Sequence, residues 1–230
     1  IHHFLFCTYG MCYNRIKSDA AKNRAASRGS GSGCAPRGVS LEIREFLTNV
    51  YGLQGNELIA ALCACAKIFT VKRGELLVRE GDPVYDAFFL VSGVFRGYFL
   101  DANGKEITDC LSYRSGTPLM TCLGFDEVSC ISVMALSGGV CLSVPIAELL
   151  SLFKQYPELL ELYNRFLVDS LRYHWKMKTM LYQYTAMQRY QWFCETHPGL
   201  IDLVGGKYVA SFLNMTPVTL SRLRRELREQ

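Results

Sequence analysis

The sequence predicts an α+β fold: an antiparallel β-roll with flanking helices, then a long helix, then a C-terminal helix-turn-helix unit. Three observations lead to this class. Short apolar runs alternate with turn residues between Ile68 and Pro145, a helical period continues from Pro157, and two short helices enclose a tight turn between Gly206 and Leu227.

Length and composition limit the possible classes of protein. The chain has 230 residues and is 50% hydrophobic, enough for one large or two small domains. No apolar run reaches the length of a membrane span, and the first residues lack the basic start, apolar stretch and cleavage site of a signal peptide. We therefore expect a soluble, cytoplasmic protein.

The chain has a net charge of +4, and its charged residues are distributed unevenly along the sequence. Residues 1–40 carry six basic and one acidic side chain, residues 41–206 carry 14 and 18, and residues 207–230 carry five and two. A mildly acidic body with a basic C-terminal unit is typical of a sensor joined to a DNA-contacting module.

The cysteines and histidines do not follow the spacing of a metal site. The ten cysteines include no Cys-x-x-Cys pair, which most zinc and iron–sulfur sites use. The four histidines lie outside the region predicted as β, so they cannot form a cluster there. We expect no metal, no cofactor, and reduced cysteines that pack as small apolar side chains.

Four segments follow from these patterns. Residues 1–40 include a stretch from Ala20 to Gly38 rich in Ala, Arg, Ser and Gly, which indicates a flexible linker. We expect residues 1–40 to be disordered or a non-native extension; a basic arm that reaches DNA is the alternative. Residues 41–155 form the β-roll sensor domain with its flanking helices, 156–184 the dimerisation helix, and 185–230 the helix-turn-helix domain.

The sensor segment begins with a predicted pair of helices between Val39 and Ala66, broken at residues 52–55. The roll follows, and its strands are separated by turns rich in Gly, Asp, Asn and Pro. The expected strands cover residues 68–71, 76–78, 87–91, 94–100, 106–111, 129–136 and 140–144.

The long helix carries an apolar seam at alternating spacings of three and four. Its members are Tyr163, Phe166, Ser170, Tyr173, Met177 and Met180. A seam sustained over about three heptads predicts pairing between two such helices, and hence a homodimer. The alternative is that this seam packs against the chain's own β-roll.

The C-terminal unit has the pattern of two helices around a turn at Asn214-Met215. Thr216 can cap the second helix and Pro217 occupies its first position. The inward residues Leu220, Leu223 and Leu227 leave Val218, Ser221, Arg222 and Arg225 on the outward face. Such a face suits the major groove, although a solvated arginine-rich helix is the alternative.

The residues themselves resemble a known family. Thr216 to Arg222 resembles the recognition helix of the Crp–Fnr superfamily of bacterial transcription regulators, and Tyr208 to Leu213 resembles its scaffold helix. Lys72 to Pro83, Phe89 to Gly93 and Asn103 to Glu106 are similar, in order, to the turns of a cyclic-nucleotide-binding β-roll. The resemblance covers residues 55–228 and implies a homodimer that binds double-stranded DNA, with RNA polymerase as a further partner.

The resemblance also implies residue roles. Ser221 and Arg222 match family residues that read base edges, whereas Val218 stands where the family commonly has a Glu, so the sequence preference cannot be carried over. Helix phase suggests phosphate contacts for Thr216, Thr219, Arg224, Arg225 and Lys207. The full DNA-binding set is Lys207, Thr216, Pro217, Val218, Thr219, Ser221, Arg222, Arg224 and Arg225.

The effector site departs from the family pattern. Met120-Thr121 replaces the Gly-Glu pair that holds the ribose, and Val128 replaces the arginine that pairs with the cyclic phosphate; Ser129 matches. A buried phosphate without an arginine is poorly compensated, so we expect no cyclic nucleotide and an unknown small-molecule effector. The expected pocket contains Arg114, Thr121, Val128 and Ser129, and a filled roll without a ligand is the alternative.

Two other functional classes were considered. An enzyme on a β-roll needs a histidine and carboxylate cluster on the strands, and residues 67–145 contain no histidine. We therefore expect no enzymatic activity. A ligand-sensing module that acts through protein partners, without specific DNA binding, is the alternative function.

Overall fold

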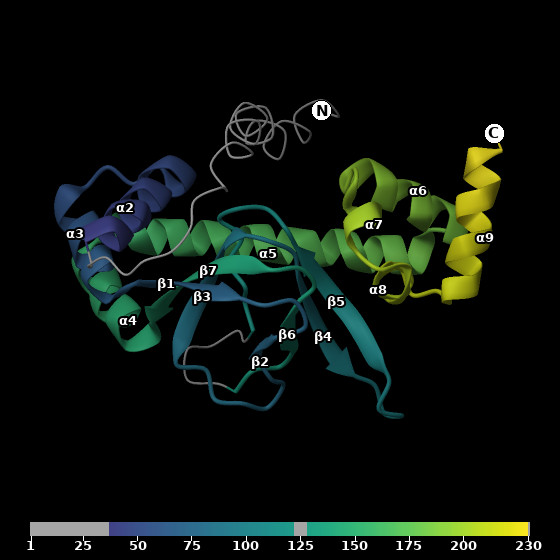
Figure 1. Ribbon diagram of the computed structural model, residues 1–230, viewed down its shortest axis with the longest axis horizontal. Helices are drawn as coiled ribbons and strands as arrows, with labels where there is room; N and C mark the ends of the chain where they lie inside the picture. Colours follow the sequence, from purple (N-terminus) through teal and green to yellow (C-terminus); the bar gives the residue numbers. More distant parts are fainter. Residues whose placement is uncertain (1–36, 122–127, 230) are drawn as a thin grey trace. The chain divides into compact units, whose positions relative to one another are not determined.

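The computed structural model describes residues 37–121 and 128–229 (Figure 1). Helix α2 (Arg37–Tyr51) begins the described part of the chain, so residues 37–40, expected in the N-terminal extension, belong to a helix. The rest of that extension, residues 1–36, lies outside the described residues. The helix α3 (Asn56–Cys65) follows after a short connection in which Gly52 adopts a φ of 71°.

Within the described residues, seven strands form two antiparallel sheets. One sheet has the order β1-β7-β3 and the other has the order β2-β6-β4-β5. Their bounds are β1 Lys67–Val71, β2 Leu76–Val78, β3 Asp86–Ser92, β4 Phe95–Leu100, β5 Glu106–Ser112, β6 Ser132–Ala135 and β7 Gly139–Pro145. The observed strands therefore lie between the predicted turns, within a few residues of the predicted bounds.

The sixth strand is shorter than predicted. It was expected from residue 129 to 136, but β6 covers only Ser132–Ala135. Ser129 explains part of the difference, because its buried hydroxyl lies 2.6 Å from the carbonyl of Ile131 and 3.3 Å from that of Thr121. A serine that bonds to local carbonyls competes with regular strand pairing.

Two glycines allow the connection before β4 to approach the start of β7. Gly93 has a φ of 105°, a region that other residues rarely adopt. A Cβ at Gly93 would lie 2.7 Å from the Cα of Gly139, and a Cβ at Gly139 would lie 2.7 Å from the carbonyl oxygen of Ser92. Both positions therefore require glycine for this close backbone approach.

Two apolar cores lie on either side of the β1-β7-β3 sheet. The space inside the roll is filled by Val71, Leu90, Phe95, Leu119, Ile131, Val133, Ala135 and Cys141. Leu142 and Val144 alternate with Cys141 on β7 and belong to a second core, shared with α2, α3, α4 (Ile146–Gln155) and α5 (Pro157–Gln183). This alternation is the period of a strand whose two faces are both covered.

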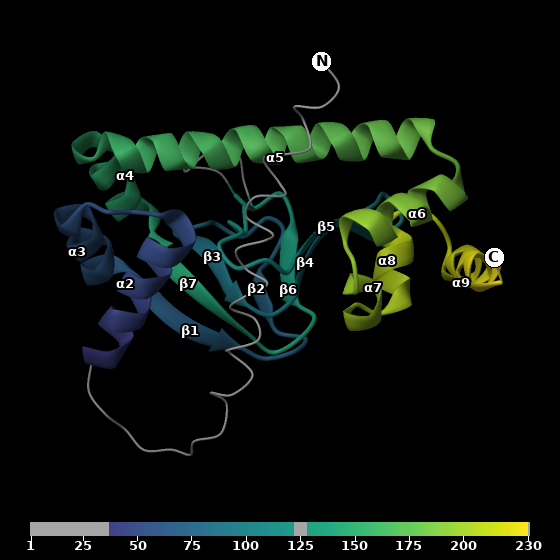
Figure 2. The same cartoon turned by 90° about the horizontal axis from the view of Figure 1, so that it is seen from above.

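The long helix α5 passes the roll and leads to the C-terminal helices (Figure 2). These are α6 (Ala186–Thr196), α7 (Leu200–Leu203), α8 (Gly206–Phe212) and α9 (Pro217–Arg228). Pro157 starts α5 as predicted, and Thr185 caps α6 through a reciprocal pair of hydrogen bonds with Gln188. The short helix α7 was not predicted. Among the helices of the described residues, none is long and apolar enough to cross a bilayer.

Arg96 is the largest side chain that the fold buries almost completely. It lies on β4 with an exposed fraction of 1%. Its Nε donates to Thr108 Oγ1 at 2.8 Å, and Nη1 forms an ion pair with the carboxylate of Glu106. The guanidinium also stacks on the rings of Tyr98 and Tyr208, 4.4 and 4.5 Å from their centroids. These partners compensate the desolvated charge.

Candidate nucleic-acid interface

The two C-terminal helices meet at a turn with a single strained residue. Asn214 has a φ of 50°, which asparagine tolerates better than most side chains. The N–H of Asn214 donates to the carbonyl of Ser211, and the N–H of Met215 donates to that of Ala210. These bonds end α8, and Thr216 then begins α9 by accepting from the N–H of Thr219 at 3.0 Å. The predicted cap and the position of Pro217 are both present.

The inner face of this pair of helices holds it in place. Val209, Phe212 and Leu213 on the first helix have exposed fractions of 2% or less, and Leu220 and Leu223 on the second are buried. They share a core with α6 and the end of α5. The apolar period predicted for both helices is therefore the face that packs.

The outer face of α9 presents the predicted DNA-binding residues to solvent. Val218 is 80% exposed, and the polar residues Thr216, Ser221, Arg222 and Arg225 are exposed as well, as is Pro217. Because all six lie on one short helix and its cap, the structure brings them together on one surface.

The other three predicted residues lie at the edges of this surface. Thr219 is half-buried, with its hydroxyl 2.9 Å from that of Thr216. Arg224 is half-buried and its Nη2 lies 3.5 Å from a carboxylate oxygen of Asp202. Lys207 is exposed at the start of α8, with its ammonium over the ring of Tyr208.

Polar contacts join this unit to the β-roll. The N–H of Thr108 on β5 donates to Ser211 Oγ on α8 at 2.9 Å. Tyr208, also on α8, covers the buried guanidinium of Arg96. The Ser211 hydroxyl also donates to the carbonyl of Glu106 at 3.4 Å, so α8 is tied to the sheet by two hydrogen bonds and one cation–π contact.

His197 lies buried between the roll and α6. Its Nδ1 is 3.0 Å from the hydroxyl of Tyr113, and the rings of Trp192, Phe193 and Phe212 surround it. Within the described residues its Nε2 has no hydrogen-bond partner. Burial, together with the nearby guanidinium of Arg114, lowers the pKa of His197 to about 4. The imidazole is therefore neutral at physiological pH.

The seam predicted for dimerisation faces the chain's own body. Met177 and Met180 are buried in the core shared with α6, α8 and α9, and Tyr173 packs against the same core. Phe166 packs against the rings of Tyr51 and Phe89, and Tyr163 lies against Phe153. Ser170 is half-buried on the same side of the helix. The alternative, packing against the chain's own β-roll, describes this seam only in part: Phe166 contacts Phe89 of β3, whereas Met177 and Met180 lie in a core formed largely by the C-terminal helices. Spacing identifies an apolar face without identifying what covers it.

A second apolar face lies on the opposite side of α5. We call it the outer stripe: Leu160, Val168, Leu171, Trp175 and Tyr182, with exposed fractions of 41, 45, 67, 66 and 81%. When Asn164 and Lys178 are included, the positions recur at spacings of three and four, and from Asn164 onward the two spacings alternate as in a heptad seam. Sequence reasoning missed this stripe because its polar members interrupt the apolar pattern.

The four residues predicted for the effector pocket do not form one site. The side chains of Thr121 and Ser129 are buried next to each other, but Val128 is 57% exposed. Arg114 donates to the hydroxyl of Tyr113 and to the carbonyl of Thr196 at the end of α6. The apolar neighbours Cys122, Leu123 and Phe125 lie outside the described residues.

The described residues contain no cluster of three or more His, Cys, Asp or Glu side chains that could hold a metal ion. Burial raises the pKa of both Cys110 and Cys141 to about 12, so these thiols are not thiolates at neutral pH. Cys130 is exposed rather than buried, which corrects the expectation for that thiol.

Comparison with known proteins identified one matching domain family and several structures with a similar fold. Residues 68–156 match the cyclic nucleotide-binding domain family. FixK2 from Bradyrhizobium japonicum superposes with a TM-score of 0.65 at 17% identity, over 72% of this chain and 85% of that chain. The chain therefore shares the fold of FixK2. The resemblance read from the sequence is thus confirmed at the level of the fold.

Two further proteins with the Crp–Fnr fold are similar. The regulator CLP of Xanthomonas campestris, described as responsive to c-di-GMP, has a TM-score of 0.64 at 13% identity, over 76% of this chain and 92% of that chain. A CooA variant from Carboxydothermus hydrogenoformans has a TM-score of 0.62 at 16% identity, over 80% of this chain and 84% of that chain. A search of curated protein sequences gave no significant match.

Proposed function

We propose that this protein is a homodimeric transcription regulator that binds a specific DNA sequence through α9. The observation that carries the proposal is the outer face of α9, where a small side chain, a hydroxyl and two arginines are exposed on a capped helix that is held by a buried inner face. A short helix with these features fits the major groove, where arginine can donate two hydrogen bonds to guanine.

Base reading and phosphate binding are assigned to different residues. Ser221 and Arg222 lie in the first half of α9 on its exposed side, where the N-terminal part of a recognition helix meets base edges. Arg225 lies one turn further, and Lys207 on α8 extends the basic surface, so both suit phosphates. Thr216, Thr219 and Arg224 are also assigned to phosphates.

The outer stripe of α5 is the proposed dimer surface. Large exposed apolar side chains at heptad spacing favour pairing with the same stripe of a second chain around a two-fold axis. Two α9 helices related by that axis would read a pseudo-palindrome with half-sites about 34–36 Å apart.

We infer that the domain does not bind cyclic AMP or cyclic GMP. The position expected to hold the phosphate-binding arginine is Val128, which is exposed, and Arg114 is engaged by Tyr113 and Thr196. A cyclic phosphate bound next to Thr121 and Ser129 would gain no positive partner from either residue. The regulator acts in the cytoplasm, where it meets DNA and RNA polymerase.

Selection from random duplex DNA tests the proposal. The wild type should enrich a two-fold symmetric site, with affinity that falls steeply as salt rises. Arg222→Ala should lose about 1–3 kcal/mol of discrimination at one base pair of each half-site. The matched variant Arg225→Ala should weaken binding to all sequences alike and lower the salt slope by about one.

Two results would contradict this assignment. If Arg222→Ala keeps full sequence discrimination, α9 does not read bases through that residue. If no site is enriched at any salt concentration, with or without cell extract, the protein acts as a sensing module through other proteins.

A further inference from the structure

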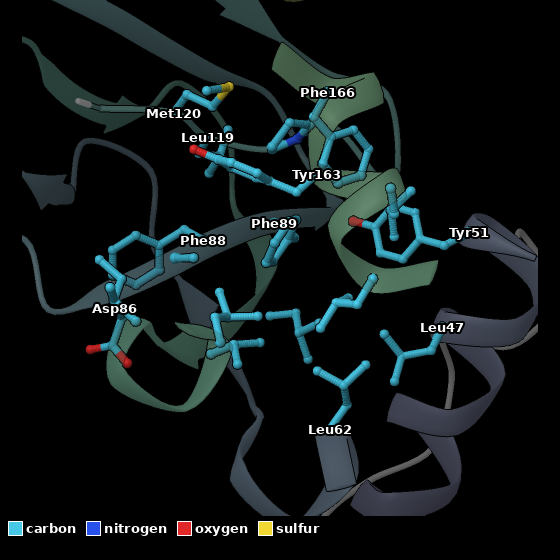
Figure 3. Close-up of a pocket in the computed structure, with 18 of the residues that line it drawn as sticks. Leu47, Tyr51, Leu62, Asp86, Phe88, Phe89, Leu119, Met120, Tyr163 and Phe166 are labelled. Carbon is cyan, nitrogen blue, oxygen red and sulfur yellow. The ribbon is translucent and has the colours of Figure 1, made fainter. Parts of the chain in front are cut away.

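A cavity of about 100 Å³ lies between the β1-β7-β3 sheet and the helices α2, α4 and α5 (Figure 3). Three strand residues that line it, Ala87, Leu142 and Val144, belong to, or pack against, the core on the helical side of the sheet. Phe88 and Leu119, which belong to or pack against the core inside the roll, also contribute to its wall. Of the four residues in the predicted effector pocket, Thr121 lines this cavity, whereas Arg114, Val128 and Ser129 do not.

The wall is almost entirely apolar. Tyr51, Phe89 and Phe166 form three mutual ring contacts, with centroids 5.6 to 6.2 Å apart, on one side of it. The Tyr51 hydroxyl is engaged by the carbonyl of Gly116 at 3.1 Å. Aliphatic side chains from four helices and two strands complete the wall, among them Leu47, Leu62, Leu149 and Leu162. Such a surface favours apolar groups over water.

Charge decides which ligands the cavity can accept. Among the described residues that line it, none is basic, and Asp86 is the only one with a charged side chain. Figure 3 shows the carboxylate of Asp86 at the edge of the group, pointing away from the apolar side chains. An anionic ligand would therefore lose its hydration without gaining a cation, which excludes carboxylates and phosphates.

The volume of the cavity also limits which ligands fit. An apolar cavity of about 150 Å³ is known to accept benzene, so about 100 Å³ accommodates a small ring or a short alkyl chain after slight adjustment of the wall. Thr121 and Tyr163 are the lining residues that carry a hydroxyl in addition to Tyr51, so the wall offers few polar groups to a ligand.

We propose that this cavity is a binding site for a small, neutral, apolar molecule: a single aromatic ring or a short alkyl chain. The site overlaps the segment that would hold a cyclic nucleotide, because Leu119, Met120 and Thr121 line it. The proposal does not depend on DNA binding. Its wall includes Leu159, Leu162, Tyr163 and Phe166 from the inner face of α5, so the ligand contacts the helix whose outer stripe is exposed.

Toluene and benzoate form a matched pair of probes for this site, because both contain one ring and only benzoate is charged. Methyl-labelled protein, as the full 230-residue chain, is titrated with each compound and followed by ¹H–¹³C correlation spectra. Toluene should shift the methyl signals of Leu62, Ala87 and Val144, and leave those of Val133 and Ala135 inside the roll unchanged. Benzoate should shift neither group.

Ala87→Val tests the location, since it adds two methyl groups to the wall of the cavity. Its affinity for toluene should fall about tenfold or more. Ala61→Val is the matched control: Ala61 packs against the same core without lining the cavity, so toluene binding should persist. Because each variant's own spectrum reports whether it is folded, loss of binding is separable from loss of structure.

The proposal is overturned if toluene shifts the roll interior as strongly as the cavity, if benzoate binds as well as toluene, or if Ala87→Val binds toluene like the wild type. If the protein binds toluene but selects no DNA sequence, the proposed cavity site stands and the proposed regulator function is wrong. If the protein selects a DNA sequence but does not bind toluene, the regulator function stands and the cavity site is wrong.

Discussion

His197 is the residue whose environment has the largest consequence for pH dependence. It is 5% exposed, and the positive charge that faces it is the guanidinium of Arg114, which itself bonds to the neighbouring hydroxyl of Tyr113. Both burial and Arg114 oppose protonation, and the pKa is lowered from 6.5 to about 4. Folding therefore keeps this imidazole neutral over a range in which an unfolded chain would protonate it.

The pH dependence follows from that difference. Between about pH 6.5 and pH 4 the unfolded state binds a proton that the folded state does not, so stability falls as the pH is lowered. Over this range the free energy of unfolding should fall by on the order of 3 kcal/mol because of His197. His197→Asn keeps a hydrogen-bonding group near Nδ1 and does not titrate, so its stability should fall less over the same range. Urea unfolding at pH 7 and pH 4.5 measures both proteins.

The control for this experiment is His174, the other histidine among the described residues. Hydrogen bonding to Asp109 raises the pKa of His174, which therefore contributes stability that is present below pH 6.5 and lost as the pH rises. His174→Asn should change the pH dependence in the opposite direction. Equal pH slopes for the wild type and His197→Asn would contradict the role assigned to His197.

At the scale of the elements, α5 is notable because it has two apolar faces with different partners. The inner face, with Met177 and Met180, is covered by the chain's own helices, whereas Leu171 and Trp175 on the outer stripe are each about two-thirds exposed. A helix that buries one face and exposes large apolar side chains on the other is suited to association.

Leu171→Glu tests the outer stripe. A carboxylate in the middle of a paired apolar seam would be buried without a partner, so the dimer should weaken about 100-fold or more. Gln183→Glu adds the same group to the same helix at an exposed position outside the stripe, and its dimer should persist. Sedimentation equilibrium gives both constants. A Leu171→Glu protein that remains fully dimeric would place the interface elsewhere.

The elements themselves were predictable because their signals are local. Turn residues predicted where most strands end, and Thr216 and Pro217 predicted the start of α9. The spacing of Leu220 and Leu223 predicted its buried face. The partner of each apolar face was not predictable in this way. The seam of α5 could not be assigned from spacing, since a core residue and an interface residue obey the same period.

Long-range contacts account for the other differences. Nothing near Arg96 in the sequence reveals that it is buried, because Tyr208, which covers it, comes from another part of the chain. The effector pocket failed for a related reason: Arg114 follows β5, and its guanidinium donates to the neighbouring hydroxyl of Tyr113 and to the carbonyl of Thr196 at the end of α6. The cavity is formed by residues from α2 to α5, and no motif marks it.

At the scale of the whole molecule, one small group of side chains joins the sensor domain to α8, in addition to the contacts of Tyr113 and Arg114 with the end of α6. Arg96 and Thr108 belong to the roll, and Tyr208 and Ser211 belong to α8. Because the guanidinium is buried, removing its cover exposes a charge that the fold has paired with only one carboxylate.

Tyr208→Leu tests this connection. Loss of the ring should cost about 1–2 kcal/mol of stability in urea unfolding, and the amide of Thr108 should exchange faster with solvent. Tyr208→Phe keeps the ring over Arg96 and should resemble the wild type in both measurements. If Tyr208→Leu is as stable and as protected as Tyr208→Phe, the stacking contact does not hold α8 on the sheet.

The division of α9 into a packed face and an open face has a consequence for how such a protein can diversify. Val218, Ser221 and Arg222 are exposed, whereas the helix is held by Leu220, Leu223 and the Thr216 cap. After gene duplication, a copy can therefore exchange its outward side chains for a new target sequence while its folding and its sensor remain as they were. The same three positions are the natural choice for a library in which specificity is to be redesigned on an unchanged scaffold.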